Sequence, residues 1–426
     1  MRLSESERRW ASRRLHFIGI GGAGMSGLAM VCYDLGVTVT GSDRGDSSYM
    51  QRLRDVGLGP VVGHNAANLP EDAEVIVSTA ISADNPELMR ARERGLQVRH
   101  RGELLAELCA EKRLIAVAGT HGKTTTTAML AWALRWLGAD PAFFVGGEVP
   151  GLGPGGIVAN AGWGAGEWVI AEADESDASF LDLQPEIAVV TNIEMDHHSR
   201  WGSVAELRAA FAEFAGKADQ VAEFASDSPG PTDLPLDVPG EHNVLNARAA
   251  LAAADLAGFD LAAVAGALAG FPGVYRRLEL KGDRDGARIY DDYAHHPTEV
   301  RAALSALREL APSRLTAVFQ PHLYSRTRAF AEQFGAALAL ADEVFVLDVY
   351  PAREEPVGEL AGVSGLDVAR AAADRMGGRR VAWTPTLAQA QVAIESRLAP
   401  GNVVVTIGAG DVFRLGEALV EGGGEG

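Results

Sequence analysis

The stretch "AVAGTHGKTTTT", residues 116–127, places a lysine between a glycine and a threonine just after an apolar run. Backbone N–H groups around Gly119 and Gly122 can line the β- and γ-phosphates of a nucleotide, and Lys123 can neutralise their charge. The hydroxyl of Thr124 can reach Mg²⁺. These residue types at this spacing therefore predict a site for ATP or GTP.

The surroundings of this loop support the prediction, although the strict phosphate-loop pattern is not met. Val117 occupies the place of the first glycine. An apolar strand before the loop and a helix after it would aim the positive helix end at the same anion. The alternative is a glycine turn that carries an incidental lysine.

A second glycine-rich turn, "GIGGAG", follows the apolar run "RLHF" near the N-terminus. Gly19, Gly21 and Gly24 satisfy the dinucleotide-binding pattern, and Asp43 ends the next strand where a ribose-binding acid is expected. The pattern selects a diphosphate at a helix N-terminus, which both NAD and a nucleotide sugar carry. A turn that only allows close helix–strand packing is a third reading, and these residues do not choose among them.

Acidic and histidine side chains follow two later apolar runs. Glu172 ends "EWVIAE" and is well placed to supply the oxygen ligand that Mg²⁺ prefers. An acid cluster after a strand can also cap a helix, but the phosphate loop upstream favours the metal. The further candidates in these two segments are Asp174, Glu175, Asp177, Glu194, Asp196, His197 and His198.

Two more groups of polar residues lie nearer the C-terminus. "PGEHNVLNA" carries His242, Asn243 and Asn246, for which helix capping is the alternative to ligand binding. "YDDYAHHPTEV" and "FQPHLYSRTR" follow apolar strands, and polar clusters at strand ends suit capture of a small charged substrate. Their candidates are Asp292, His295, His296, His322, Arg326 and Arg328.

Apolar strands alternate with helices along the whole chain, which predicts an α/β fold with parallel sheets. We expect three domains at 1–111, 112–273 and 274–426: a Rossmann-like domain, a central ATPase domain of the phosphate-loop type with a parallel sheet, and a second Rossmann-like domain. Residues 226–240 are rich in proline and glycine and are expected to form a loop.

The composition narrows the class of protein. A net charge of -19 over 426 residues argues against wholesale binding to nucleic acid or an anionic membrane. Two cysteines provide no disulfide framework, and no apolar stretch has the length of a membrane span, so a cytoplasmic protein is expected.

Taken together, these blocks resemble the Mur ligases of peptidoglycan synthesis, and most closely their alanine-adding branch. The resemblance runs from "FIGIGGAGMSGLA" to "VVVTIGAGD", nearly the whole chain. The matching blocks, in order, are "GSD", "STAISADNPE", "AGTHGKTTTT", "IAEADESDASFL", "VTNIEMDH", "PGEHNVLNA", "DDYAHHPTEV" and "FQPHLYSRTR".

The resemblance implies a role for each candidate residue. The first domain would hold a UDP sugar rather than NAD, through Gly21, Gly22, Ala23, Gly24 and Met25 at the diphosphate and Ser42 and Asp43 at the uridine end. ATP would contact Gly119, Thr120, His121, Gly122, Lys123, Thr124, Thr125, His242, Asn243, Asn246, Arg277 and Asp292. Thr124, Glu172 and His197 would bind Mg²⁺, and Tyr293, His295, His322 and Arg326 would surround the amino acid.

The chemistry implied by the family is ATP-driven amide formation. The carboxylate of UDP-N-acetylmuramate attacks the γ-phosphate, and L-alanine displaces phosphate from the resulting acyl phosphate. Lys123, Glu172, His197 and Arg326 are the residues implied in catalysis, and closure of the third domain is expected to exclude water.

Other functions stay open at this point. A recycling ligase that joins a tripeptide to the same sugar is the nearest alternative, although "GIGGAGMSG" favours the alanine-adding branch. A dehydrogenase leaves "GTHGKT" unexplained, and a non-catalytic sensor predicts binding without turnover. The sequence also leaves open a homodimer.

The chain departs from the family pattern at three places. The middle domain is several tens of residues shorter than usual near 226–240, Leu323 stands where a basic residue is common, and Ala294 replaces a common glycine.

Overall fold

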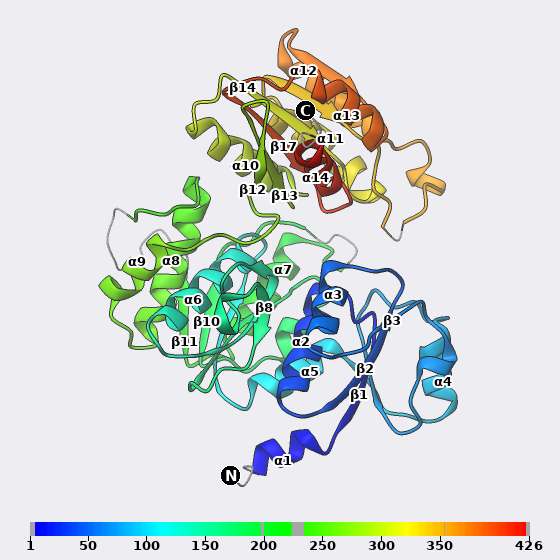
Figure 1. Cartoon of the computed structure of the whole chain (residues 1–426), viewed down its shortest axis with the longest axis vertical. Helices are drawn as coiled ribbons and strands as arrows, with labels where there is room; N and C mark the ends of the chain where they lie inside the picture. Colours follow the sequence, from blue (N-terminus) through cyan, green and yellow to red (C-terminus); the bar gives the residue numbers. More distant parts are fainter. Residues whose placement is uncertain (1–4, 197–199, 224–233, 353, 423–426) are drawn as a thin grey trace. The chain divides into compact units, whose positions relative to one another are not determined.

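The computed structural model describes residues 5–196, 200–223, 234–352 and 354–422. The chain divides into two compact units. The first contains residues 1–235 and 245–272, and the second contains residues 236–244 and 273–426. Figure 1 labels the helices and strands of both units.

The first sheet of unit 1 is parallel, with the strand order β3-β2-β1-β4-β5. Its centre is β1, whose residues are almost wholly buried, and the chain steps outward on both sides of it, as in a dinucleotide-binding fold. The strands are β1 (Arg14–Ile18), β2 (Thr38–Asp43), β3 (Val61–Val62), β4 (Glu74–Val77) and β5 (Val98–His100). The helices of this part are α1 (Glu5–Ala11), α2 (Ala23–Asp34), α3 (Ser48–Asp55), η1 (Ala66–Asn68), α4 (Pro86–Glu93) and α5 (Arg101–Cys109).

The second sheet of unit 1 has the order β11-β10-β6-β9-β7-β8 and is parallel except for the edge strand β8. Its strands are β6 (Arg113–Ala118), β7 (Ala142–Val149), β8 (Ala159–Gly162), β9 (Trp168–Glu172), β10 (Ile187–Val190) and β11 (Gln220–Glu223). The associated helices are α6 (Lys123–Trp136), η2 (Pro154–Gly156), η3 (Ser179–Asp182), α7 (Val204–Ala215), α8 (Glu241–Leu256) and α9 (Leu261–Ala269).

The two sheets of unit 1 are joined through helix α2, which packs against β7 and β8. The side-chain amide of Asn160 donates to the carbonyl of Ala23 at 2.8 Å, and a Cβ on Gly27 would crowd Ala161. This close packing explains why the first two of the three expected domains form one compact unit. The boundary at residue 111 falls between α5 and β6 and is retained as a proposal.

The sheet of unit 2 has the order β12-β13-β17-β14-β15-β16, with only β12 antiparallel. Buried apolar side chains from both faces of its central strands form two cores. Its strands are β12 (Glu279–Arg284), β13 (Ala287–Asp292), β14 (Arg314–Phe319), β15 (Glu343–Val346), β16 (Arg380–Trp383) and β17 (Asn402–Ile407). Its helices are α10 (Pro297–Glu309), α11 (Tyr324–Leu338), η5 (Gly358–Leu360), α12 (Gly365–Met376), α13 (Leu387–Glu395) and α14 (Phe413–Glu421).

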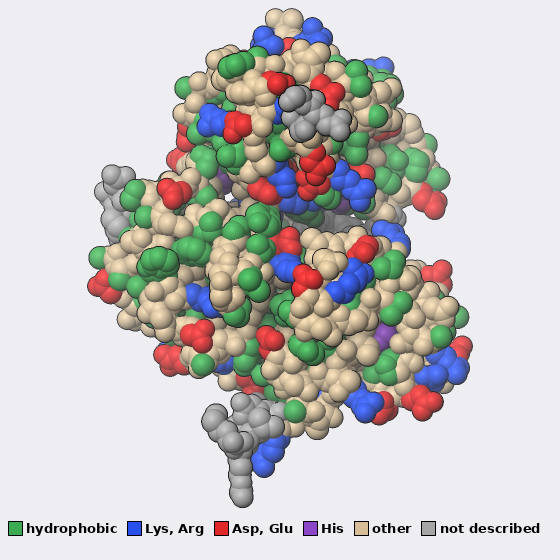
Figure 2. All heavy atoms as spheres, in the orientation of Figure 1, with side chains coloured by type: hydrophobic (Ala, Val, Ile, Leu, Met, Phe, Trp, Pro, Cys, Tyr) green, Lys and Arg blue, Asp and Glu red, His purple; other side chains and the backbone are tan. Residues whose placement is uncertain are grey.

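The predicted α/β fold with three parallel-rich sheets is therefore confirmed. Among the residues that the structure describes, no helix combines the length and the apolar character needed to span a bilayer. On the face drawn in Figure 2, acidic and basic side chains are interspersed over both units. That face does not present the broad field of one sign that polyanion-binding surfaces use.

Candidate active site

The predicted phosphate loop lies between β6 and α6, and both of its glycines are required by the local geometry. Gly119 has a φ of 133°, and a Cβ there would collide with the hydroxyl of Thr191. Gly122 has a φ of 83°, and a Cβ there would collide with the side chain of Asn246. Because only glycine fits both the backbone angle and the space, the loop can run close to its neighbours and then turn into the helix.

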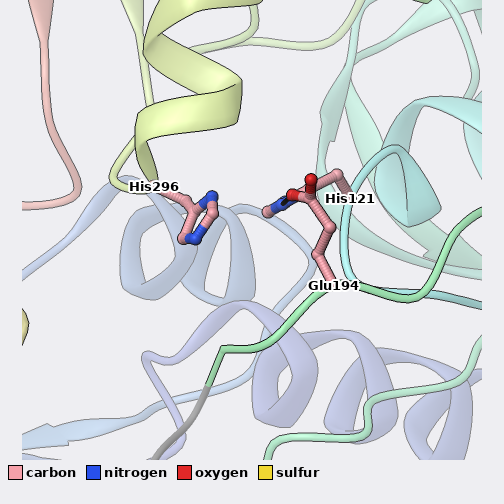
Figure 3. Close-up of side chains that lie close together, drawn as sticks. All are labelled: His121, Glu194 and His296. Carbon is pink, nitrogen blue, oxygen red and sulfur yellow. Dashed lines mark hydrogen bonds and ion pairs between the residues drawn. The ribbon is translucent and has the colours of Figure 1, made fainter. Parts of the chain in front are cut away.

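The loop is braced by the segment that follows β10. The backbone N–H of Thr120 donates to the carbonyl of Asn192 at 3.0 Å, and that of His121 donates to the Asn192 side chain at 2.9 Å. The imidazole of His121 lies 3.0 Å from a carboxylate oxygen of Glu194, and Figure 3 shows these two side chains pointing towards each other. His296, also drawn in Figure 3, belongs to unit 2. These contacts fix the loop against the segment that follows β10.

Lys123 is the first residue of α6, and its side chain is largely buried. Its Nζ donates to the carbonyls of Gly119 at 2.6 Å and Thr120 at 3.2 Å, so it curls back over the loop. The same ammonium lies 2.7 Å from a carboxylate oxygen of Glu175, which is 1% exposed. The lysine is therefore positioned inside the loop where phosphate oxygens are expected.

Charge around this lysine comes from the segment after β9. Burial alone would lower the pKa of Lys123, but the carboxylates of Glu175, Asp174 and Glu172 raise it. Burial raises the pKa of Glu175 to about 7 against the opposing effect of Lys123. Burial also opposes ionisation of Asp174, yet Arg101 and Lys123 hold its pKa well below the ordinary range. The ammonium is thus kept charged while one adjacent carboxyl titrates near neutrality.

Thr124 and Glu172 lie together at the start of α6 and the end of β9. The Thr124 hydroxyl donates to Oε1 of Glu172 at 3.0 Å, and the backbone N–H of Gly146 donates to Oε2 at 2.7 Å. A hydroxyl and a carboxylate are the oxygen ligands that Mg²⁺ prefers, so this donor set fits the predicted metal. His197, the third predicted ligand, lies outside the described residues.

The remaining predicted ATP residues fall in both units. Thr125 is buried in the first turn of α6, and Asn246 lies in unit 1, 3.4 Å from the hydroxyl of Thr126. His242 and Asn243 belong to unit 2. Burial lowers the pKa of the His242 imidazole to about 4, and positive charge from Arg277 adds to this effect.

Asp292 ends β13 in unit 2 and is buried. Its carboxylate accepts from the backbone N–H groups of Leu278 and Ala294, each at 2.8 Å. Burial raises its pKa to about 6, against the effects of Arg277 and these two hydrogen bonds. The side chain thus stabilises the turn that positions Tyr293. Ala294, the departure noted in the sequence, is buried at this turn with φ outside the left-handed region.

The glycine turn of the first sheet is closed by Asp43. The backbone N–H of Gly21 donates to one carboxylate oxygen at 2.9 Å, and that of Gly45 donates to the other at 3.2 Å. A Cβ on Gly21 would crowd Asp43 and Met50. Gly22 is the N-cap of α2 and supplies no side-chain cap. No side chain therefore caps the first N–H groups of the helix, from Ala23, Gly24 and Met25, which suits the predicted diphosphate site.

Ser42 is fully buried near the end of β2. Its hydroxyl donates to Glu87 at 2.6 Å and lies 2.9 Å from Nδ1 of His64. Sequence reasoning did not single out Glu87 or His64, although Glu87 ends the quoted block "STAISADNPE". The proline-preceded start of α4 that contains Glu87 was the signal available. The uridine contact of Ser42 stays a prediction, and the structure adds its contacts with Glu87 and His64.

An ion-pair cluster connects the two nucleotide loops of unit 1. Arg101, at the start of α5, donates to Asp174 at 2.7 Å and to Asp177 at 2.9 Å. A Cβ on Gly24 would lie 2.9 Å from the same guanidinium. The arginine therefore contacts both the first turn of α2 and the acidic segment beside Lys123. Through these contacts it links the glycine turn to the phosphate loop.

The four residues predicted to surround the amino acid form a contact series within unit 2. The rings of Tyr293 and His295 lie 5.4 Å apart, and those of His295 and His322 lie 6.1 Å apart. Arg326 approaches Nδ1 of His322 at 3.4 Å, and the ring of Tyr350 stacks on His322 at 5.8 Å. The structure thus brings together residues that are far apart in the sequence.

Leu323 precedes α11 with a φ of 69°, a conformation that costs free energy for a residue with a branched side chain. Its backbone is held by Tyr350, whose carbonyl accepts from the Leu323 N–H at 3.0 Å, and by Thr327. The strained turn places His322 beside the first turn of the helix that carries Arg326. Leu323, which stands where a basic residue is common in the family, therefore lies next to the predicted amino-acid site.

Three family models match the chain in sequence order. The catalytic domain of the Mur ligase family matches residues 14–113, the Mur ligase middle domain matches 117–229, and the Mur ligase glutamate ligase domain matches 276–410. The chain belongs to the Mur ligase family. The resemblance noted in the sequence is therefore confirmed over nearly the full length.

Individual members of the family extend the match. The UDP-N-acetylmuramate–L-alanine ligase of Renibacterium salmoninarum is 44% identical, with 96% of this chain and 95% of the relative covered. The corresponding ligase of Nocardioides sp. is 43% identical over the same shares. The crystal structure of the UDP-N-acetylmuramate-alanine ligase of Thermotoga maritima superposes with a TM-score of 0.82 at 31% identity, covering 96% of this chain and 98% of the other.

A murein peptide ligase structure from Psychrobacter arcticus has a TM-score of 0.67 at 24% identity, covering 97% of this chain and 99% of the other. At that identity the likeness shows the shared fold alone. The relatives that match this Mur ligase at 40–44% identity over 96% of the chain are UDP-N-acetylmuramate–L-alanine ligases.

Proposed function

We propose that this Mur ligase joins L-alanine to the carboxylate of UDP-N-acetylmuramate, with conversion of ATP to ADP and phosphate. The observation that carries the proposal is that one compact unit holds two glycine-containing turns, each leading into a helix N-terminus: the turn before α2 and the turn before α6. A ligase that couples a nucleotide sugar to ATP needs both. The full-length similarity to alanine-adding relatives at 40–44% identity supports the choice of substrates.

The reaction follows from the chemistry of the two loops. A carboxylate oxygen of the sugar attacks the γ-phosphorus, ADP leaves, and an acyl phosphate forms. The amine nitrogen of L-alanine then attacks the acyl carbon, and the tetrahedral intermediate expels inorganic phosphate while the nitrogen loses a proton. No protein nucleophile takes part. The buried thiols agree with this, since burial raises the pKa of Cys32 to about 12 and that of Cys109 further.

The protein must bring two anions together, which is unfavourable without positive charge between them. Lys123 and the N-terminus of α6 supply such charge at the phosphate loop. Nζ of Lys123 donates to the carbonyls of Gly119 and Thr120 and contacts Glu175, so a phosphate oxygen must take over at least one of these interactions to bind the ammonium.

Mg²⁺ fits the oxygen donors of Thr124 and Glu172, and we assign these residues to it together with His197 from the sequence. Bound there, the metal would neutralise charge on the phosphate oxygens of ATP. Glu172 is held in orientation by Gly146, and Thr124 is fixed in the first turn of α6.

The amino-acid end of the reaction is assigned to the cluster of Tyr293, His295, His322 and Arg326 in unit 2. A guanidinium suits the carboxylate of alanine, because its planar donors can bind two oxygens at once. His242, Asn243, Asn246, Arg277 and Asp292 are retained as nucleotide-binding residues. The use of ATP and a nucleotide sugar favours the cytoplasm as the site of the reaction.

The experiment is a phosphate-release assay in which each reactant is left out in turn. Release is expected only when ATP, Mg²⁺, UDP-N-acetylmuramate and L-alanine are all present. Rapid release without the sugar, or none with all four, would overturn the assignment. A tripeptide tested in place of L-alanine addresses the recycling reaction, and preferential turnover of the tripeptide would favour that alternative.

A further inference from the structure

Glu87 lies in the first turn of α4, beside the first sheet, and is completely buried. Four polar groups contact its carboxylate. Its Oε1 accepts from the backbone N–H of Asn65 at 2.9 Å and from the Asn68 amide at 2.8 Å. Its Oε2 accepts from the Ser42 hydroxyl at 2.6 Å and lies 3.0 Å from Nε2 of His16. Every lone-pair direction of the carboxylate is thus directed at a specific neighbour.

This environment keeps Glu87 ionised. Burial alone would raise its pKa, but the hydrogen bonds from His16, Ser42, Asn65 and Asn68 lower it to about 2. At neutral pH the carboxylate can therefore only accept hydrogen bonds. The hydroxyl hydrogen of Ser42 must point at Oε2, because the 2.6 Å contact needs one proton and Ser42 alone can supply it.

The orientation of the Ser42 hydroxyl determines which ring nitrogen of His64 carries the hydrogen. Nδ1 of His64 lies 2.9 Å from the Ser42 oxygen, whose hydrogen is already committed to Glu87. Nδ1 also lies 3.6 Å from Oε1 of Glu87, a second acceptor. Nδ1 must then carry a hydrogen and donate it, so in the uncharged form of the ring Nε2 is the acceptor.

That acceptor lies at the ligand side of the sheet. His64 comes just after β3, its side chain is 18% exposed, and the hydrogen bonds recorded among the described residues do not include one at its Nε2. The carboxyl ends of parallel strands form the binding crevice of such a sheet. Nε2 is therefore the nitrogen of His64 that is left to meet a ligand in that crevice.

Strand order indicates which part of the nucleotide arrives there. The glycine turn follows β1, Asp43 ends β2, and His64 follows β3, and these three strands are adjacent. Neighbouring strands are roughly 4.8 Å apart, so β3 lies about 10 Å from β1. A uridine diphosphate bound at the turn would extend its ribose over β2 and its base over β3.

We propose that Glu87 is a positioning residue that, through Ser42, fixes His64 in the tautomer whose Nε2 accepts the ring N–H of uracil. The inference rests on the proposed function, because it assumes that the crevice binds a UDP sugar. It also accounts for base selection, since the ring nitrogen of cytosine at the same place is an acceptor and would face another acceptor.

Replacing Glu87 by glutamine should reverse the hydrogen bonds from His64 to Ser42 and from Ser42 to residue 87, because the two side chains have nearly the same shape. The amide oxygen must occupy the Oε1 position, where Asn65 and Asn68 are both donors. The amide NH₂ then faces Ser42 and His16, so the Ser42 hydroxyl accepts from it and turns its own hydrogen towards His64. His64 becomes the Nε2–H tautomer and places a donor opposite the uracil N–H.

The first test is the tautomer itself, read from the ¹⁵N shifts of His64 in the ligand-free enzyme. The wild type is expected to carry the hydrogen on Nδ1, and Glu87→Gln is expected to carry it on Nε2. Glu93→Gln, an exposed change on the same helix, is the matched control and should resemble the wild type. A wild-type hydrogen on Nε2, or an unchanged tautomer in Glu87→Gln, would overturn the proposal.

The second test separates binding from catalysis. Glu87→Gln is expected to raise KM for UDP-N-acetylmuramate on the order of 10- to 100-fold, with kcat changed by less than about threefold, because an N–H would face an N–H. N3-methyl-UDP should inhibit the wild type on the order of tenfold less well than UDP, and 2′-deoxy-UDP about as well as UDP. The reverse pattern would assign His64 to the ribose and refute the base contact.

Different results would overturn the proposed function and the role of Glu87. Absence of any ligation with UDP-N-acetylmuramate would overturn the proposed function, whatever the tautomer. Normal ligation with His64 in the Nε2–H form would leave the function intact and overturn this inference alone. If Glu87→Gln does not fold, the wild-type tautomer and the N3-methyl-UDP comparison still decide.

Discussion

Replacing Lys123 by alanine should separate the catalytic role of this lysine from its structural role. The ammonium is expected to stabilise the transferring phosphoryl group, and loss of one such donor lowers kcat on the order of 10² or more. The same ammonium also lies 2.7 Å from the buried carboxylate of Glu175. A fall in activity alone would therefore not distinguish the two roles.

The structural contribution can be estimated from the titration of Glu175. Burial raises the pKa of this carboxyl to about 7 from an ordinary 4.5, even with Lys123 in place. A raised carboxyl pKa stabilises the folded state fully below pH 4.5, and this contribution is lost as the pH rises towards 7. Without the ammonium the carboxyl stays protonated to higher pH, and each further unit costs about 1.4 kcal/mol.

The variant should therefore lose stability relative to the wild type in a pH-dependent way. At pH 6 both proteins hold Glu175 protonated, and this effect contributes almost no difference in the free energy of unfolding. At pH 8 the difference should reach about 1.4 kcal/mol. Urea unfolding at the two pH values measures it. Lys217→Ala, which removes a part-buried lysine bonded to the Leu181 carbonyl and to Glu213, is the control and should show no such pH dependence.

A double variant completes the test. Adding Glu175→Gln to Lys123→Ala removes the titrating carboxyl, so the pH-dependent loss of stability should disappear while kcat stays low. If activity returns together with stability, Lys123 acts by holding Glu175 and not on the phosphate. An unfolding difference that is the same at pH 6 and pH 8 would refute the account of the buried pair.

Three further predictions concern the metal, the loop and the first sheet. Glu172→Gln should raise the Mg²⁺ concentration for half-maximal rate on the order of tenfold, and an unchanged metal titration would remove Glu172 from the site. Gly119→Ala should abolish ATP binding measured by calorimetry, because the new Cβ would collide with Thr191. Gly138 is the control: it has open space around it and a φ of 78°, so Gly138→Ala should only lower the free energy of unfolding by about 1–2 kcal/mol. Glu87→Gln should lower the urea midpoint more at pH 7 than at pH 3.5, because a pKa lowered to about 2 gives stability above pH 4.5 that is lost on acidification; a gap independent of pH would contradict this.

Much of the fold could be predicted from the sequence because its signals are local. Apolar runs with glycine turns gave the strand–helix alternation, and the position of Lys123 gave the start of α6. Thr124 and Glu172 could be paired in advance because parallel strands end at one edge of a sheet. The organisation into two compact units could not be predicted, since it depends on contacts of α2 with β7 and β8 that carry no local pattern.

Some contacts of the candidate site could not be predicted from local patterns. Ser42 stays a prediction for the uridine, and its burial between Glu87 and His64 results from packing of α4 against the sheet. Glu175 was noted as one acid of a cluster, and its contact with Lys123 depends on the turn after β9. The role of His197 and the shortened segment near 226–240 stay predictions from the sequence, since His197 and residues 224–233 lie outside the described residues.

The central claim is that a sugar carboxylate is activated as an acyl phosphate, and transfer of its oxygen tests this most directly. UDP-N-acetylmuramate labelled with ¹⁸O in both carboxylate oxygens is turned over with ATP and L-alanine, and the inorganic phosphate is analysed by mass spectrometry. The account predicts one ¹⁸O atom in each phosphate released and one left in the amide product. Unlabelled phosphate accompanying amide formation would contradict it.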